Sequence, residues 1–225
     1  MTRLPMGLFV MLSLGATGAG GHSEGAQVIP LPEPARTGDV SIEQALEGRR
    51  SVRSYAREAL PLAVIGQLAW AAQGVTDSAT GFRAAPSAGA TFPLEIDLLI
   101  HGTPGLDDGV YRYIPRDHAL RQRLTGDRRQ GVHEAALQQA AVLAAPVVMV
   151  ISAVMTRTEA RYGPRAERYV HMEAGHAAQN VSLQGVALEV GSVVIGAFDD
   201  AALAAALQLD EAERPLYVVP LGRLP

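Results

Sequence analysis

The sequence predicts one α+β domain, and three observations favour this fold class. Short apolar runs with the composition of strands are interleaved with longer segments of helical composition, and no internal repeat is present. Apolar residues make up 48% of the 225-residue chain, which is enough to bury a core in one domain. The domain is expected to cover residues 41–225.

The domain is predicted to begin with two helices. Ser41 is a suitable N-cap for a first helix, "IEQALEGRR", which gives way to a loop just after Gly48. Pro61 suits a first helical position and opens a second helix, which closes at Gly74 in the manner of a C-cap. Residues 75–91 are rich in glycine, serine and alanine, and we expect them to form an ordered loop.

Strands are predicted in the middle of the chain. Residues 94–100, "LEIDLLI", and 109–114, "GVYRYI", predict two strands with a glycine-containing connection. An alanine-rich helix is expected over about residues 132–145. Pro146 then precedes a buried strand, "VVMVISAV".

A long helix is predicted from Arg165 to about Val190. It contains Gly175 and Gly185, each of which costs about 1 kcal/mol relative to alanine inside a helix. These glycines therefore indicate close packing of another helix or of a ring system. The remaining segments are the apolar stretch 192–198, a helix over 199–207 and a final strand over 215–222.

The N-terminal residues 1–25 predict a signal peptide. Arg3 precedes an apolar run from Leu4 to about Leu14 that is too short to span a bilayer, and small residues follow as in a cleavage region. A floppy apolar tail is the alternative. Residues 26–40, with three prolines, predict an extended linker. We therefore expect export to the periplasm without a stable membrane anchor, with a cytoplasmic location as the alternative.

Composition excludes several classes of function. A formal charge of -4 and a pI near 5.9 provide no general field for nucleic acid, so no nucleic-acid partner is expected. The absence of cysteine excludes disulfides, thiolate nucleophiles and Fe–S clusters. All 19 basic residues are arginine, so Schiff-base enzymes, lysine-anchored pyridoxal phosphate enzymes and P-loop NTPases are excluded as well.

The stretch "EGRRSVRSYA" is the strongest local motif, because it places three arginines and a serine within five residues. A solvated basic face is the ordinary interpretation of such a run. "HMEAGH" is a weaker motif. His171 and His176 are five positions apart and diverge by about 140° around a helix, whereas the two histidines of the zincin motif are four positions apart. We expect structural histidines there and no metal site.

Five motifs together resemble the nitroreductase family of flavoproteins, in its SagB/ThcOx-type dehydrogenase branch. They occur in order between Ser41 and Pro225: "RRSVRSY", "APSAGATFPLEIDLLI", "GVYRYIP", "ERYVHMEAGHAAQNVSLQGVALEVGSVVIGAFDD" and "RPLYVVPLGR". The resemblance implies a central, mainly antiparallel sheet wrapped by helices. It also implies an intertwined homodimer with FMN at the subunit interface.

The resemblance further implies three groups of FMN-binding residues. A basic loop would hold the phosphate and ribityl chain, because guanidinium forks match phosphate oxygens and a serine adds a donor; it comprises Arg49, Arg50, Ser51 and Arg53. A small-residue loop would reach the isoalloxazine ring from the partner subunit; it comprises Pro86, Ser87, Ala88 and Gly89. The remaining implied residues are the turn near flavin N5, Ile195, Gly196 and Ala197, and a C-terminal phosphate ligand, Arg223.

The implied function is an FMN-dependent oxidoreductase with a ping-pong mechanism. Hydride would pass from a small-molecule donor, NAD(P)H or another small substrate, to a small-molecule acceptor. A flavin-binding or flavin-sequestering protein without turnover is the alternative. Azoline oxidases of this branch are associated with an active-site lysine and tyrosine, and this chain has no lysine. Peptide-azoline oxidation by that arrangement is therefore not expected.

Overall fold

The structure is a computed structural model that describes Met1 and residues 27–225. Apart from Met1, the predicted signal peptide lies outside the described residues. Among the helices of residues 27–225, none combines the length and the hydropathy that a membrane span requires.

Seven strands form the main sheet of the described residues, in the order β1-β6-β5-β4-β7-β9-β8. All neighbouring strands pair antiparallel, so the predicted α+β class and mainly antiparallel sheet are confirmed. The strands are β1 Val28–Pro30, β4 Leu94–Ile100, β5 Gly109–Ile114, β6 Ala119–Thr125, β7 Val147–Val154, β8 Val190–Ser192 and β9 Glu213–Arg223.

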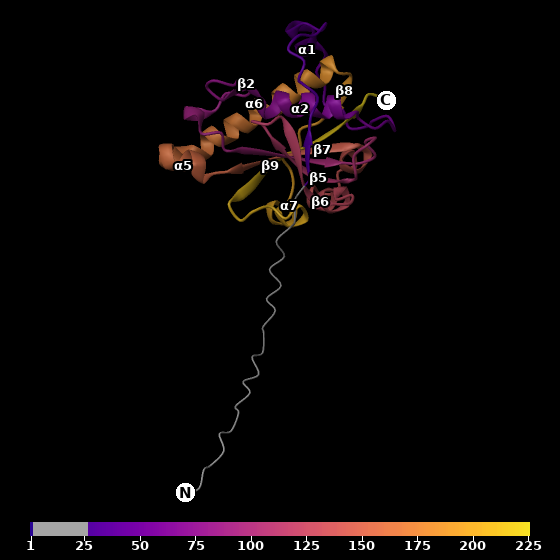
Figure 1. The fold of residues 1–225 in the computed structure, drawn as a ribbon. Helices are drawn as coiled ribbons and strands as arrows, with labels where there is room; N and C mark the ends of the chain where they lie inside the picture. The colour runs from indigo at the N-terminus through magenta and orange to yellow at the C-terminus, as the bar shows by residue number, and fades with distance from the viewer. Residues whose placement is uncertain (2–26) are drawn as a thin grey trace.

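Helices cover both faces of this sheet (Figure 1). One core cluster joins the sheet to α2 and α6, and a second joins its other face to α3, α4 and α7. Strand β4 shows why both faces are covered: Leu98 belongs to the first cluster and its neighbour Leu99 to the second, because successive side chains point to opposite faces. The helices are α1 Ile42–Gly48, α2 Leu62–Gln73, α3 Arg129–Ala135, α4 Ala140–Ala144, α5 Thr156–Tyr162, α6 Ala166–Ala187 and α7 Asp200–Leu207.

The helix starts follow local chemistry, as α1 illustrates. The Ser41 hydroxyl accepts a hydrogen bond from the Gln44 N–H at 3.2 Å, and the Gln44 side chain accepts one from the Ser41 N–H at 2.8 Å. This reciprocal pair is a capping box, so the predicted N-cap is confirmed. Gly74 is the C-cap of α2, but for a steric reason: a Cβ there would clash with the Trp70 ring, while its φ of -63° is ordinary.

The single helix predicted over residues 132–145 is wrong. The structure has two short helices, α3 and α4, separated by Leu137 and Gln138, whose φ angles are 56° and 58°. Left-handed residues cannot continue an α-helix, and the Gln138 N–H instead donates to the His133 carbonyl at 2.9 Å. High alanine content favoured the longer helix but does not determine where the chain turns.

Two other segments also differ from the expectation. The predicted loop 75–91 contains a small hairpin, β2 Val75–Asp77 and β3 Phe82–Arg83, followed by a 3-10 turn, Ala88–Ala90. Strand β6, "ALRQRLT", was not predicted, because its two arginines interrupt the apolar pattern of a strand. It forms by pairing with β5.

The segment predicted as a linker is extended but is not free of the domain. Strand β1 pairs with β6, and Leu31 is buried. Two contacts fix this segment: the Leu31 N–H donates to the His118 carbonyl, and Ala35 exchanges two hydrogen bonds with the Gln67 side chain. Prolines favour an extended chain but do not decide whether it docks.

The long helix α6 ends three residues earlier than predicted, at Ala187. Close packing occurs at Gly185, but not against the predicted helix or ring system: a Cβ there would lie 2.6 Å from the Val190 carbonyl oxygen. The close neighbour is the chain's own return into β8, whereas no atom lies within 4 Å of the corresponding position at Gly175.

Candidate functional site

The basic loop after α1 is fixed to the β8–β9 end of the sheet. Ser51 forms a parallel bridge with Ser192, and the Val52 N–H donates to the Ser192 carbonyl at 2.8 Å. The Tyr55 hydroxyl lies 2.8 Å from the Val52 carbonyl oxygen and 3.2 Å from that of Pro220. The loop therefore has a defined position although most of its side chains are exposed.

Arg223 lies at the same end. It pairs with Val190 across β8 and β9, and its carbonyl accepts a hydrogen bond from the Ala56 N–H at 3.1 Å. Its guanidinium donates to the Leu188 carbonyl and lies 3.6 Å from a carboxylate oxygen of Glu58. The structure thus brings the C-terminal arginine to the basic loop, as the motifs implied.

Two glycines permit this close approach. A Cβ at Gly222 would lie 2.8 Å from Tyr55 Cβ, and a Cβ at Gly191 would lie 2.7 Å from Val52 Cγ1. Real Cβ atoms do not approach other atoms so closely, so the basic loop can lie against these strands only where glycine occupies both positions.

The arginines of the loop differ in their engagement. Arg50 Nη1 donates to the carbonyls of Glu47 and Arg49, both at 2.7 Å, so it serves the C-terminus of α1. Within the described residues, Arg49 and Arg53 make no side-chain hydrogen bond or ion pair, and Ser51 is exposed. Arg49, Arg53 and Ser51 are therefore the members of the loop with donors available to an anion.

The predicted N5 turn lies farther along the same path. Ile195 exchanges backbone hydrogen bonds with Val218 at 2.9 and 3.0 Å, so the chain runs antiparallel to β9 from Val190 toward Gly196. At about 3.3 Å per residue this extended segment covers about 20 Å. The Ile195 side chain is buried in the core, whereas Gly196 and Ala197 are exposed. Only the backbone of Ile195 can face a ligand.

A cavity of about 280 Å³ lies beside Gly196. It is lined by His171, Ala174, Gly196, Phe198, Asp200, Pro215, Leu216 and Tyr217. His171 was expected to be a structural residue, but it is exposed and borders this cavity. Nothing in the sequence pattern around "HMEAGH" distinguishes these two roles.

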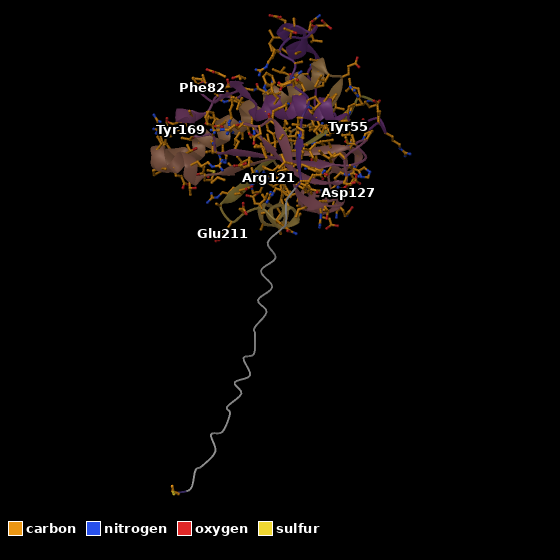
Figure 2. All side chains as sticks on the ribbon, in the orientation of Figure 1. Tyr55, Phe82, Arg121, Asp127, Tyr169 and Glu211 are labelled. Atoms are coloured by element: carbon orange, nitrogen blue, oxygen red, sulfur yellow. The ribbon has the colours of Figure 1, made fainter. Side chains whose placement is uncertain are left out.

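The loop of Pro86–Gly89 lies at the opposite end of the molecule. It precedes β4, whose Leu94 pairs with Ala153 of β7, whereas the basic loop packs near Leu221, which pairs with Val147. The two ends of β7 are about 23 Å apart at 3.3 Å per residue. Figure 2 shows the same separation, with Tyr55 on one side and Phe82 and Tyr169 on the other. One chain therefore does not bring these two loops together.

The Pro86–Gly89 loop is held by its own Ser87 side chain and by Arg161 of α5. The Ser87 hydroxyl accepts a hydrogen bond from the Phe92 N–H at 2.9 Å, and Arg161 donates to the Gly89 carbonyl at 3.3 Å. Gly89 has a φ of 60°, and a Cβ there would lie 2.6 Å from the Tyr162 hydroxyl oxygen. Glycine is therefore required at this position.

Sequence patterns did not indicate a buried acid behind this loop. Glu173 of α6 is 2% exposed, and burial raises its pKa to about 7 against the opposing effects of Ser87, Arg83 and Gln73. In the described residues, Glu173 Oε1 and Gln73 Nε2 are buried without a hydrogen-bond partner. In the sequence, Glu173 is one polar position of a predicted helix, and only the packing around it shows that it is buried.

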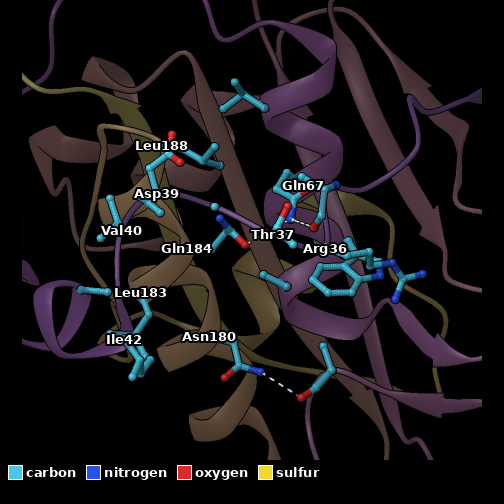
Figure 3. Close-up of a pocket in the computed structure, with 18 of the residues that line it drawn as sticks. Arg36, Thr37, Asp39, Val40, Ile42, Gln67, Asn180, Leu183, Gln184 and Leu188 are labelled. Carbon is cyan, nitrogen blue, oxygen red and sulfur yellow. Dashed lines mark hydrogen bonds between the residues drawn. The ribbon is translucent and has the colours of Figure 1, made fainter.

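A larger cavity, of about 620 Å³, lies between residues 33–42, α2 and α6 (Figure 3). Arg36 stacks over the Trp70 ring at 5.0 Å, and Asn180 donates to the Ala84 carbonyl at 3.2 Å. Asn180 lines this cavity but was not among the predicted site residues. None of the predicted site residues lines this cavity, so its size does not make it the better candidate for their chemistry.

The model described as "Nitroreductase family" matches residues 46–223. The chain belongs to the nitroreductase family. The curated protein "Putative nitroreductase MJ1384" of Methanocaldococcus jannaschii is 42% identical over 185 residues, which cover 82% of this chain and 92% of that protein.

Solved structures of the nitroreductase fold agree with this assignment. A crystal structure named as a "putative nitroreductase" from Ralstonia eutropha has a TM-score of 0.78 and 31% identity, and the match covers 88% of this chain and 90% of that one. Another, from Desulfovibrio desulfuricans, is a complex with FMN, with a TM-score of 0.58, 23% identity, and coverage of 83% and 87%. The Escherichia coli microcin synthetase McbBCD complex has a TM-score of 0.68 at 22% identity, with coverage of 96% and 85%. The last two likenesses concern the fold alone.

Proposed function

We propose that this nitroreductase-family chain is an FMN-dependent oxidoreductase that passes hydride between a small-molecule donor and a small-molecule acceptor. One observation carries the proposal. The Arg49–Arg53 loop bridges Ser192 and Arg223 pairs with Val190 at one end of the β8–β9 pair, and the extended segment from there to the exposed Gly196 covers about 13 Å from Ser192 and about 20 Å from Val190. An elongated ligand with a phosphate at one end and a flat ring at the other fits this arrangement.

The residues present suit FMN chemically. Arg49 and Arg53 offer guanidinium forks to a phosphate and the Ser51 hydroxyl adds a donor, while Arg223, whose guanidinium also donates to the Leu188 carbonyl, adds positive charge at the same end. At the other end, Gly196 has no side chain to block a ring, and the nearest atom to a Cβ there would be 3.5 Å away on Tyr217. When bound, FMN supplies the hydride chemistry, while the chain binds the cofactor and places substrates beside it.

The reaction we propose is a ping-pong exchange in which donor and acceptor use the same site in turn. The cavity beside Gly196 is the space in this chain where they would bind. NAD(P)H or another small substrate serves as the donor. We place the chain in the SagB/ThcOx-type branch on its five motifs, without the lysine-dependent azoline chemistry of that branch, since the chain has no lysine.

We also propose an intertwined homodimer. The Pro86–Gly89 loop lies at the far end of β7 from the basic loop, and we propose that it contacts the flavin held by another subunit. A two-fold arrangement places one subunit's loop over the ring end of the other's site, and the reverse. Each site would then contain both loops.

Export to the periplasm completes the proposal. The chain would be cut between about residues 20 and 27, which leaves β1, Val28–Pro30, in the mature protein. N-terminal sequencing of protein from fractionated cells tests this, and an intact Met1 in the cytosol would contradict it.

FMN titration of arginine variants tests the cofactor site. Arg49→Ala and Arg53→Ala should each raise the FMN dissociation constant about 10- to 150-fold, since a hydrogen bond to a charged group contributes about 1.5 to 3 kcal/mol. Arg116→Ala, an exposed arginine on the β5–β6 turn, is the matched control and should leave it unchanged. Flavin fluorescence reports binding, and far-UV circular dichroism confirms folding. Unchanged affinity in both loop variants would refute the site.

Flavin reduction separates turnover from sequestration. An oxidoreductase should show bleaching of bound FMN with a donor such as NAD(P)H, followed by reoxidation with an electron acceptor. A flavin-sequestering protein should bind FMN without either change. Absorbance spectra of the loaded protein distinguish the two.

A further inference from the structure

The two buried side-chain atoms that lack hydrogen-bond partners in the described residues belong to neighbouring residues. They are Glu173 Oε1 on α6 and Gln73 Nε2 on α2. Glu173 is 2% exposed and Gln73 fully buried, so solvent does not satisfy these atoms freely. Buried polar atoms are rarely left unpaired, and two in one place suggest a function.

Neighbouring contacts orient groups toward this carboxyl. Arg83 Nη1 donates to Gln73 Oε1 at 2.8 Å, while Gln73 Nε2 has no hydrogen-bond partner among the described residues although Gln73 lies close enough to Glu173 to lower its pKa. The Ser87 hydroxyl oxygen accepts a hydrogen bond from the Phe92 N–H at 2.9 Å, so its own hydrogen remains available. Ser87 lies close enough to Glu173 to lower its pKa. Glu173 is thus adjacent to the side chain that anchors the Pro86–Gly89 loop.

Few charges face Glu173. From β3, Arg83 is the charged neighbour, and its guanidinium is itself stacked over the Phe92 ring at 4.5 Å. The pKa of Arg83 is in turn influenced by Glu95 of β4, Arg157 of α5 and Tyr113 of β5. From α2 and from the loop, Glu173 meets only the neutral groups of Gln73 and Ser87. Burial is the largest influence on its protonation, so its carboxyl can change charge near neutral pH.

We propose that Glu173 is a positioning residue for the Pro86–Gly89 loop, and that its change of charge couples FMN binding to pH. This inference rests on the proposed function, in which that loop contacts the flavin held by the partner subunit.

The physical link that we infer is a hydrogen bond from the Ser87 hydroxyl to the Glu173 carboxyl, whose pKa Ser87 lowers. An ionised Glu173 accepts a charge-assisted bond from the Ser87 hydroxyl, about twice as strong as a neutral one, and so holds the loop in place. A protonated Glu173 offers only a neutral acceptor, and the loop is held less firmly. FMN affinity should therefore rise as Glu173 ionises.

FMN titration between about pH 5 and pH 8 tests the coupling in three proteins: the parent, Glu173→Gln and Glu167→Gln. The Glu173→Gln variant reproduces the neutral form, and Glu167 is an exposed carboxylate on the same helix that serves as the matched control. Ionisation of the FMN phosphate affects all three equally, so ratios of dissociation constants isolate Glu173. At the upper pH, the FMN dissociation constant of the parent should be lower than that of Glu173→Gln by about fivefold or more. At the lower pH, the two constants should be equal. Glu167→Gln should follow the parent.

Removal of the Ser87 hydroxyl tests the route of the coupling. Ser87→Ala should abolish the pH-dependent difference between the parent and Glu173→Gln, because the charge then has no link to the loop. A role of Glu173 in stability alone predicts lower melting temperatures with no change in these ratios.

Carbon-13 NMR of labelled glutamate carboxyls measures the pKa of Glu173 in the parent protein. A variant is needed only to assign the Glu173 signal. Linkage requires the pKa of Glu173 to fall on FMN binding by the amount that the affinity changes. An unchanged pKa, or a ratio that is constant with pH in protein that binds FMN, overturns the coupling and leaves the proposed function standing. Failure of the parent to bind FMN at any pH overturns both.

Discussion

Arg112 organises the buried charges on the central sheet. Its guanidinium donates to both oxygens of Asp97 at 2.8 Å and also to Glu95 and Glu213. Asp97 is fully buried, and Arg123 pairs with it at 2.9 Å. Burial alone would raise the pKa of Glu213, but its hydrogen bonds from Arg112 outweigh burial and hold that pKa below its usual value. Among the described residues, Arg112 is the one arginine that contacts all three of these acids.

Arg112→Ala should therefore destabilise the domain by about 3 to 5 kcal/mol, because it leaves buried carboxylates without their shared cation. Arg121 pairs with Arg112 in register across β5 and β6 but is exposed, so Arg121→Ala is the matched control and should change stability by about 0.5 kcal/mol or less (Figure 2). Urea unfolding of both variants measures the difference. Equal stability of the two would show that the buried network contributes little.

Glu173 predicts a dependence of stability on pH. Its pKa is about 7 in the folded chain and near its ordinary 4.5 when unfolded, so the folded state holds the proton more tightly. The protonated Glu173 therefore contributes at most about 3 kcal/mol to the free energy of unfolding. This contribution is fully present below about pH 4.5 and is lost as pH rises through about 7. Glu173→Gln should remove that loss, which urea unfolding at several pH values would measure. Glu167→Gln should keep the parent's slope, and a parent with the same slope as Glu173→Gln would contradict the expectation.

At the scale of elements, the basic loop depends on how closely it packs against β8 and β9. A Cβ added at Gly222 would lie 2.8 Å from Tyr55 Cβ and 2.9 Å from Pro146 Cδ. Neither neighbour is the far end of a flexible side chain, so an added methyl must displace the loop or the strand. The position of the arginines that we propose to bind the phosphate is therefore set by β9 as much as by their own motif.

Gly222→Ala should lower stability by about 1 to 3 kcal/mol, as expected of overpacking, and should weaken FMN binding although no arginine is changed. Gly38→Ala is the control, since no atom lies within 4 Å of the position of its Cβ. Thermal unfolding and FMN titration measure the two effects. Unchanged FMN affinity in Gly222→Ala would mean that the loop tolerates displacement.

At the scale of the whole molecule, the two implied halves of the flavin site lie at opposite ends of β7. The Arg49–Arg53 loop packs near Leu221, and the Pro86–Gly89 loop precedes Leu94. Stable interfaces of obligate dimers bury roughly 2,000 to 5,000 Å² in total. An interface of that size would join the two halves of each site.

Subunit mixing tests this arrangement directly. A chain with Arg53→Ala and a chain with Gly89→Val should each bind FMN poorly as homodimers, because every site carries one damaged half. Their mixed dimer has one intact site, so mixing after mild dissociation should restore part of the FMN binding. Sedimentation should show dimers throughout. A flavin-loaded monomer, or no recovery on mixing, would contradict a shared site.

Much of the fold and part of the site could be predicted from sequence because the relevant signals are local. Ser41 capped its helix as expected, and the strands at 94–100, 109–114 and 147–154 formed at their predicted positions. Strand β6 and the break at Leu137 were not predicted, since pairing partners and left-handed turns decide them. The role of Glu173 was likewise hidden, because burial depends on α2 and the loop that cover it.

By itself the sequence determined the α+β class, the family motifs and the identity of the basic loop, because periodicity, capping and residue type act over a few neighbouring positions. Only the tertiary structure decided that Arg223 joins that loop, that residues 28–31 dock on the domain, and that the Pro86–Gly89 loop stands at the other end of the sheet. The reason is physical: strand order and register set which distant segments meet, and they follow from how the whole core packs.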